Sequence, residues 1–147
     1  NLLWKYGRAD LPAKALDESP CGLLFVNPAL PLNGKAVVAV VDDLQSVAAS
    51  HGHMLYMTLN IETSTSMVAV INILFDRSQP GETERAHRCA DDMLACIRRH
   101  GLEPYRARVD MMKDIVQDNE YWRTIRRLKD VFDPDNIIAP GRYNLVD

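Results

Sequence analysis

The residues that could carry chemistry stand together at Tyr105 and Arg106, inside the stretch from Gly101 to Asp110. The tyrosine offers a phenol that donates and accepts hydrogen bonds, and the guanidinium beside it is planar, permanently charged and weakly hydrated for a cation. If this stretch is a strand, successive side chains point to opposite faces of a sheet. The pair suits the binding of an oxyanion in a cavity. The same residues also suit an edge strand with a snorkelling tyrosine and a surface arginine paired with Glu103 or Asp110.

Length and charge narrow the class of protein. The chain has 147 residues, of which 47% are hydrophobic, and a net charge of −3. This length predicts one domain with a real core. Lysine and arginine form no run, so we expect no nucleic-acid partner. The apolar runs are short and interrupted, so we expect no membrane span, and no signal peptide is visible. Asn1 in place of Met fits an excised or cleaved piece of something longer.

The three cysteines cannot close a disulfide framework. Cys89 and Cys96 are seven residues apart on an expected helix, about 10 Å along its axis, which is too far for a disulfide. Cys21 stands alone, and we see no CxxC motif or Cys/His cluster for zinc. We therefore expect reduced thiols, a cytoplasmic protein and no metal site.

The elements that position Tyr105 follow from hydrophobic periodicity. Residues 1–20 show no clean period and predict an extended initial segment, while residues 21–147 form the domain. Strands are expected at 22–26, with a turn after it at Asn27-Pro28, at 53–61, at 67–75 and around Tyr105. Helices are expected from Asn33-Gly34 to Gly52 and from near Ser78 to Gly101.

This order of strand, helix, strand, strand, helix, strand predicts an α+β, ferredoxin-like (βαββαβ) antiparallel sheet with both helices on one face. The strand at 67–75 is apolar on both faces except at Asn72, so we expect it to be central. A short helix within 109–116 and a longer one, capped by Asp118 or Asn119, should follow. The longer helix carries an apolar stripe and a basic, solvated side, and an irregular tail begins at Asp133-Pro134.

The tail from Leu128 to Arg142, LKDVFDPDNIIAPGR, resembles the C-terminal signature of FAD-linked oxidases. Within that group, the Tyr105-Arg106 pair about 36 residues before Arg142 resembles the vanillyl-alcohol oxidase / 4-cresol methylhydroxylase branch. The segments GLLFVNP at 22–28 and INILFDR at 71–77 fall at the spacings of that branch. The resemblance covers roughly residues 20 to 144.

The resemblance implies the cap, or substrate, domain and tail of a larger flavoenzyme, with the FAD-binding domain outside this chain. It implies that the reaction takes a hydride from the benzylic carbon of a 4-alkylphenol-like substrate to FAD. Tyr105 and Arg106 would hold the phenolate oxygen, and Arg106 and Arg142 would lie near the flavin edge or the phenolate. A free phenol has a pKa near ~10, so a neighbouring cation is needed to favour phenolate at neutral pH.

The sequence also departs from the family pattern. Val68 and Ala69 stand where members often carry a pair of histidines. Leu23 and Ala15 stand where some members attach the flavin, and neither can form that bond. We therefore expect FAD that is not covalently attached to this segment.

Two other functions stay open. The first is an FAD-linked oxidase for another substrate, such as a hydroxy acid, whose carboxylate Arg106 or Arg142 would clamp bidentately. The second is a non-catalytic ferredoxin-like module that binds a small molecule or a partner. The exact substrate, the electron acceptor (oxygen or a cytochrome) and homo-oligomerisation are not decided by the sequence.

Overall fold

The computed structural model describes residues 20–143, and the predicted initial segment lies outside them up to residue 19. The chain divides into two compact units, one ending at Arg106 and the other beginning at Ala107. Each unit is described by itself. The domain boundaries expected from the sequence stay a prediction. Among the described residues, no helix combines the length and the apolar character needed to cross a membrane.

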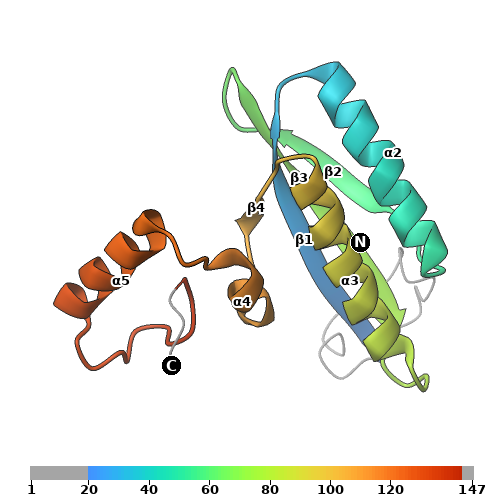
Figure 1. Ribbon diagram of the computed structural model, residues 1–147. Coiled ribbons are helices and arrows are strands. Elements are labelled where there is room, and N and C mark those ends of the chain that lie inside the picture. The colour runs from blue at the N-terminus through green and yellow to red at the C-terminus, as the bar shows by residue number, and fades with distance from the viewer. Residues whose placement is uncertain (1–19, 144–147) are drawn as a thin grey trace. The chain divides into compact units, whose positions relative to one another are not determined.

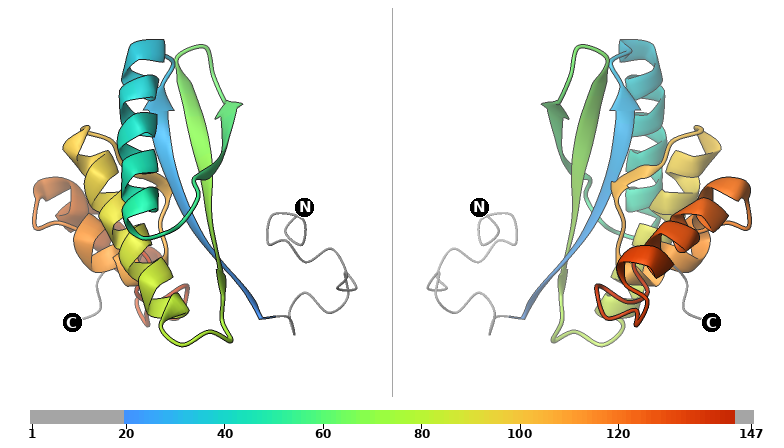
Figure 2. Two further views of the ribbon diagram at one scale, coloured as in Figure 1. Left: turned by 90° about the vertical axis from the view of Figure 1, so that its right-hand side faces the viewer. Right: turned by 90° about the vertical axis from the view of Figure 1, so that its left-hand side faces the viewer.

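The first unit is a four-stranded antiparallel sheet with two helices on one face (Figures 1 and 2). Its elements are β1 (Cys21–Pro31), α2 (Gly34–Ser50), β2 (Tyr56–Ile61), β3 (Ser66–Asp76), α3 (Glu82–Arg99) and β4 (Pro104–Arg106). The strand order is β2-β3-β1-β4, with every neighbouring pair antiparallel. The predicted α+β, ferredoxin-like fold is therefore confirmed, and β3 lies inside the sheet as expected.

The core lies between the sheet and the helices. Ala69, Ile71 and Ile73 on β3 are at most 1% exposed, and they share one face because alternate residues of a strand point the same way. The helices bury Val37, Val40, Leu44 and Ala48 of α2 and Ala86, Ala90, Met93, Leu94 and Ile97 of α3. The apolar stripes predicted for both helices are confirmed.

Both helices end in the same way. Gly52 and Gly101 follow them with φ +70°, a conformation that glycine adopts without steric cost. The next residue then donates its N–H to a carbonyl five positions back, His53 to Ala48 at 2.9 Å and Leu102 to Ile97 at 3.0 Å. This pattern satisfies carbonyls that the helix leaves unpaired. The helix ends predicted at the two glycines are confirmed.

The turn predicted at Asn27-Pro28 is wrong, because β1 runs through both residues to Pro31. Pro28 has no N–H to donate, and the strand tolerates it where the pairing with β4 shifts between Asn27 and Pro28. The next strand starts at Tyr56 rather than at the predicted residue 53, because the chain up to His53 still belongs to the end of α2.

The second unit consists of short helices and an irregular tail. It contains the 3-10 turn η2 (Val109–Met111), α4 (Met112–Ile115) and α5 (Glu120–Phe132). Asn119 caps α5, since its side-chain oxygen accepts the Trp122 N–H at 3.1 Å. The helices predicted here are confirmed. However, α5 has no buried residue, and its apolar stripe is exposed, with Phe132 at 79%.

Candidate functional site

Tyr105 and Arg106 lie at the edge of the sheet, on the three-residue strand β4. Both side chains are exposed, Tyr105 at 67%. Within residues 20–143, no hydrogen bond or ion pair is found for either side chain. The two carboxylates that could have paired with Arg106 are already taken: Glu103 by Arg98 at 3.4 Å and Asp110 by Arg108 at 3.0 Å. The guanidinium of Arg106 is therefore available to bind an anion.

Asn27 is the neighbour that sequence reasoning missed. It lies opposite Arg106 in the β1–β4 pairing, and directly opposed residues of a sheet point to the same face. Its side-chain oxygen Oδ1 is buried and accepts no hydrogen bond from the described residues. A buried acceptor without a donor costs about 1–3 kcal/mol. A donor placed beside Arg106 by a ligand or another domain would remove that cost.

The face that carries Asn27 and Arg106 points away from α2 and α3. Val26 is 2% exposed on the helix side, and the next residue of the strand must point the other way. Phe25 shares the face of Asn27 and is 44% exposed, opposite the nearly buried Asn72. We call this the open face, and it includes Leu23, Phe25, Asn27, Tyr56, Val70, Asn72, Leu74 and Arg106. The face is apolar at Leu23, Phe25, Val70 and Leu74, and it carries polar groups both at the β1–β4 pair (Asn27, Arg106) and at the β2–β3 pair (Tyr56, Asn72).

In the second unit, Asp133 holds the tail together. Its carboxylate is 4% exposed, and it accepts the N–H groups of Ile137 at 3.0 Å and Ile138 at 2.8 Å. Lys129 pairs with it and also donates to the Ile138 carbonyl at 2.7 Å. The hydrogen bond from Lys129, more than the two backbone donors, holds the pKa of this carboxyl below its usual value. Asp133 therefore has a structural role in the tail.

Residues 107–143, which include this tail, match the family described as "FAD linked oxidases, C-terminal domain". The chain carries the C-terminal domain of an FAD-linked oxidase. Over 129 residues it is 30% identical to the 1'-carboxy-chondrochloren decarboxylase of Chondromyces crocatus, covering 87% of this chain and 24% of that protein. Over 94 residues it is 34% identical to the 4-cresol dehydrogenase (hydroxylating) flavoprotein subunit of Pseudomonas putida, covering 61% of this chain and 18% of that protein. The chain thus spans a quarter or less of the length of these relatives.

Solved structures agree with this assignment to the FAD-linked oxidases. A p-cresol methylhydroxylase with substrate bound superposes with a TM-score of 0.74 at 26% identity, over 84% of this chain and 24% of that one. The 4-ethylphenol oxidase from Gulosibacter chungangensis, in its isoeugenol complex, superposes with a TM-score of 0.72 at 20% identity. The match covers 85% of this chain and 25% of that one. This second likeness supports the fold alone. The resemblance seen in the sequence is confirmed.

Arg142, the third predicted site residue of this FAD-linked oxidase domain, belongs to the second unit. It is exposed, and its backbone N–H donates to the Ala139 carbonyl at 3.1 Å. Its convergence with Tyr105 and Arg106 stays a prediction.

The second unit of the domain also has a cleft of about 470 Å³ beside α5. The rings of Trp122 and Tyr143 stack along it, with centroids 6.5 Å apart. Arg123, part of the predicted basic side, also lines the cleft and pairs with Asp118 at 2.8 Å and Glu120 at 3.2 Å. These ion pairs neutralise part of the positive charge on the side of α5 that the sequence predicts to be basic and solvent-exposed.

Proposed function

We propose that this chain is the substrate-domain portion of an FAD-dependent oxidoreductase that takes a hydride from the benzylic carbon of a 4-alkylphenol-like substrate. One observation carries the proposal: Arg106 is exposed and unpaired within residues 20–143, beside Tyr105 at the edge of the open face. The similarity to a 4-cresol dehydrogenase flavoprotein subunit supports a phenolic substrate class. Tyr105, Arg106 and Arg142 are the residues to which we assign the site.

Two polar groups at the edge of the open face, on Arg106 and Asn27, are chemically complementary to the edge of a flavin. The pyrimidine edge of a flavin presents both carbonyl acceptors and an N–H donor. Arg106 is a free donor, and the buried Asn27 Oδ1 is an acceptor without a donor, so the open face has a complement for each. FAD, when bound, supplies the hydride acceptor. We assign Arg106 and Arg142 to its edge, and the FAD-binding domain of the same protein to the open face.

The protein's own contribution is to hold the phenol in its reactive form. A phenol oxygen beside the Arg106 guanidinium is favoured as phenolate, because an opposite charge within a few ångströms lowers its pKa from ~10. We assign the Tyr105 hydroxyl as a second donor to the same oxygen; because neighbouring residues of β4 point to opposite sides, it would reach that oxygen around the sheet edge. Negative charge on that oxygen pushes electrons toward the benzylic carbon and eases the departure of hydride. Leu23, on the open face, offers no group that could bond a flavin covalently.

A second candidate is a substrate that carries a carboxylate. The relative from Chondromyces crocatus is named a carboxy-chondrochloren decarboxylase, so carboxylated substrates occur among the proteins similar to this chain. A free guanidinium binds a carboxylate through two parallel hydrogen bonds. Arg106 or Arg142 would then fix the carboxylate, and the phenol would bind elsewhere or be absent.

The test is steady-state kinetics of Arg106→Ala and Arg106→Lys in the full-length enzyme, with a para-alkylphenol and with a carboxylated substrate. Loss of a charge contact that strengthens in the transition state should lower kcat/KM for the phenol about 100-fold, or ~3 kcal/mol. Lysine keeps the charge but lacks the planar fork, so it should restore only part of the rate. Arg88→Ala, an exposed arginine on α3, is the matched control and should behave as wild type.

Wild-type rates for both Arg106 variants with both substrates would refute the assignment. A loss confined to the carboxylated substrate would favour the second candidate. Absence of flavin absorbance from the purified full-length protein would instead favour a non-catalytic module.

A further inference from the structure

The two helices share a short sequence pattern, Asp, seven residues, His and Gly, that recurs at an interval of 49 residues. Asp43 and His51 with Gly52 in α2 and its cap correspond to Asp92 and His100 with Gly101 in α3 and its cap. Each histidine ends its own helix and reaches the aspartate of the other one. The Nε2 of His51 lies 2.7 Å from Oδ2 of Asp92, and the Nε2 of His100 lies 2.7 Å from Oδ2 of Asp43. The same interhelical contact is thus built twice.

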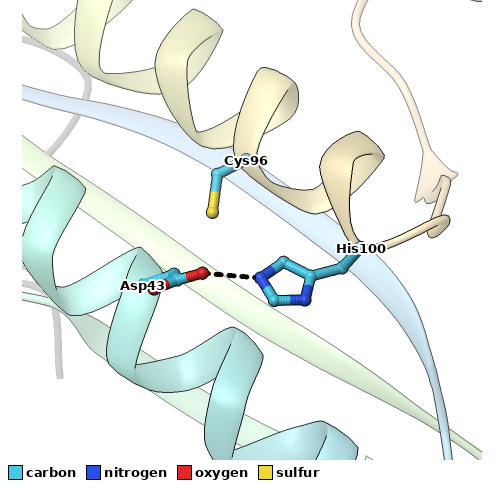
Figure 3. Close-up of side chains that lie close together, drawn as sticks. All are labelled: Asp43, Cys96 and His100. Atoms are coloured by element: carbon cyan, nitrogen blue, oxygen red, sulfur yellow. Dashed lines mark hydrogen bonds and ion pairs between the residues drawn. The ribbon is translucent and has the colours of Figure 1, made fainter.

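Only one copy includes a thiol. Four residues before His100 stands Cys96, which lies on the same side of α3, while the matching position before His51 is Val47. The Cys96 sulfur, a ring nitrogen of His100 and a carboxylate oxygen of Asp43 all lie within 4.8 Å of one another. Figure 3 shows the thiol and the imidazole of α3 directed toward Asp43 on α2. An ion pair between helices accounts for the histidine and the aspartate, but it gives no role to the sulfur.

We propose that Asp43, Cys96 and His100 form a binding site for a thiophilic divalent cation such as Zn²⁺. Thiolate, imidazole and carboxylate are the three ligand types of zinc sites in proteins, and three protein ligands leave one tetrahedral position for water. The Asp43 side chain is 59% exposed and that of His100 is 26% exposed, so solvent reaches the site from one side. The site lies between the helices and is distinct from the open face, which points away from them.

The geometry is close to what a bound cation needs. With metal–ligand bonds of ~2.0–2.3 Å, ligand atoms of a tetrahedral site lie ~3.3–3.6 Å apart. The Asp43–His100 contact would open slightly from 2.7 Å, and the sulfur would close in from at most 4.8 Å. The Asp43 and His100 side chains are both partly exposed, which leaves them room to rotate toward a shared cation.

Binding must displace the proton of Cys96. Burial is the main cause that raises the pKa of this thiol, with Arg99 opposing it and Asp43 adding to it, whereas a metal binds the thiolate. The sulfur–metal bond forms as the proton leaves to solvent and the cation loses a water molecule. His100 binds as the neutral imidazole through Nε2, with its proton on Nδ1.

The experiment is calorimetric titration of Zn²⁺ into the reduced 147-residue chain, with Co²⁺ absorption to report a thiolate bond. We expect one equivalent to bind. Cys96→Ala and His100→Ala should each weaken binding by at least ~10-fold, because loss of even an outer partner of a metal ligand costs about 10–100-fold. The repeat supplies the controls. His51→Ala removes the other histidine, and Cys89→Ala removes a buried thiol outside the cluster, so both should bind Zn²⁺ as wild type.

A gain-of-ligand variant keeps the test independent of any loss of folding. Val47→Cys would complete the second copy with His51 and Asp92, and the stoichiometry should rise from one Zn²⁺ to two. No binding by the wild type, unchanged binding in Cys96→Ala and His100→Ala, or an equal loss in His51→Ala would each overturn the proposal. A stoichiometry that stays at one in Val47→Cys would also count against the thiol as the deciding ligand.

Discussion

Gly22 provides a sharp test of how tightly β1 packs on β3. It lies opposite Phe75, and a Cβ at this position would stand 2.3 Å from two ring carbons and 2.7 Å from a third. The ring is 6% exposed, so it has little room to move aside. Forcing extra atoms into a packed core costs about 1–3 kcal/mol. We therefore expect Gly22→Ala to lower the free energy of unfolding by ~2 kcal/mol and Tm by roughly 6 °C.

Thermal unfolding followed by circular dichroism measures this effect. Gly34→Ala is the control, because a Cβ at this first residue of α2 meets no atom within 4 Å, and its Tm should stay at or slightly above the wild type. Phe75→Leu shrinks the ring, so the double variant with Gly22→Ala should lose less than the sum of the single variants by ~1 kcal/mol or more. A wild-type Tm for Gly22→Ala, or simple additivity in the double variant, would show that the close approach of strand and ring is not as described.

Two further predictions concern the tail and the cofactor. The lowered pKa of Asp133 means that its contacts stabilise the tail above the ordinary carboxyl pKa of ~4 and are lost as pH falls through the lower folded value. Limited proteolysis after residue 133 should therefore speed up in that acid range in the wild type, and already at pH 7 in Asp133→Asn, whereas the exposed Asp135→Asn should leave the cleavage rate unchanged. The 147-residue chain by itself should bind little or no FAD, because its sequence has no glycine-rich phosphate-binding loop at a strand–helix junction. Micromolar or tighter binding in a fluorescence titration would contradict that expectation.

Local patterns were enough to predict most of the fold. The 3.6-residue period of α2 and α3, the glycines after them and the two apolar faces of β3 are all encoded within short windows of sequence. The path of β1 could not be predicted in this way, because the dipeptide Asn27-Pro28 is locally typical of a turn. Only the neighbouring strand β4, about 80 residues later, makes room for Pro28 through the shift in pairing.

The residue types of the site could be predicted from the sequence, but the pairing of their side chains could not. Tyr105 and Arg106 stood out in the sequence. Whether the Arg106 guanidinium is unpaired depends on the folded structure, in which Glu103 pairs with Arg98 and Asp110 with Arg108. The Asp43–Cys96–His100 cluster was missed because its members come from two helices that meet only in the folded chain. The sequence did contain a clue to this cluster: the pattern Asp, seven residues, His and Gly occurs twice, at an interval of 49 residues.

The exposure of α5 has a consequence for how the native state opens. A helix of 13 residues is marginal in water when no side chain is buried, because nucleation is costly and packing normally supplies most of the stability. The contacts that hold α5 are the Asn119 cap, the surface pair of Arg123 with Glu120, the contacts of Lys129 with the tail and the stacking of Trp122 on Tyr143. We therefore expect α5 to unfold locally at a lower free-energy cost than β3, and so to open many times for each opening of that strand.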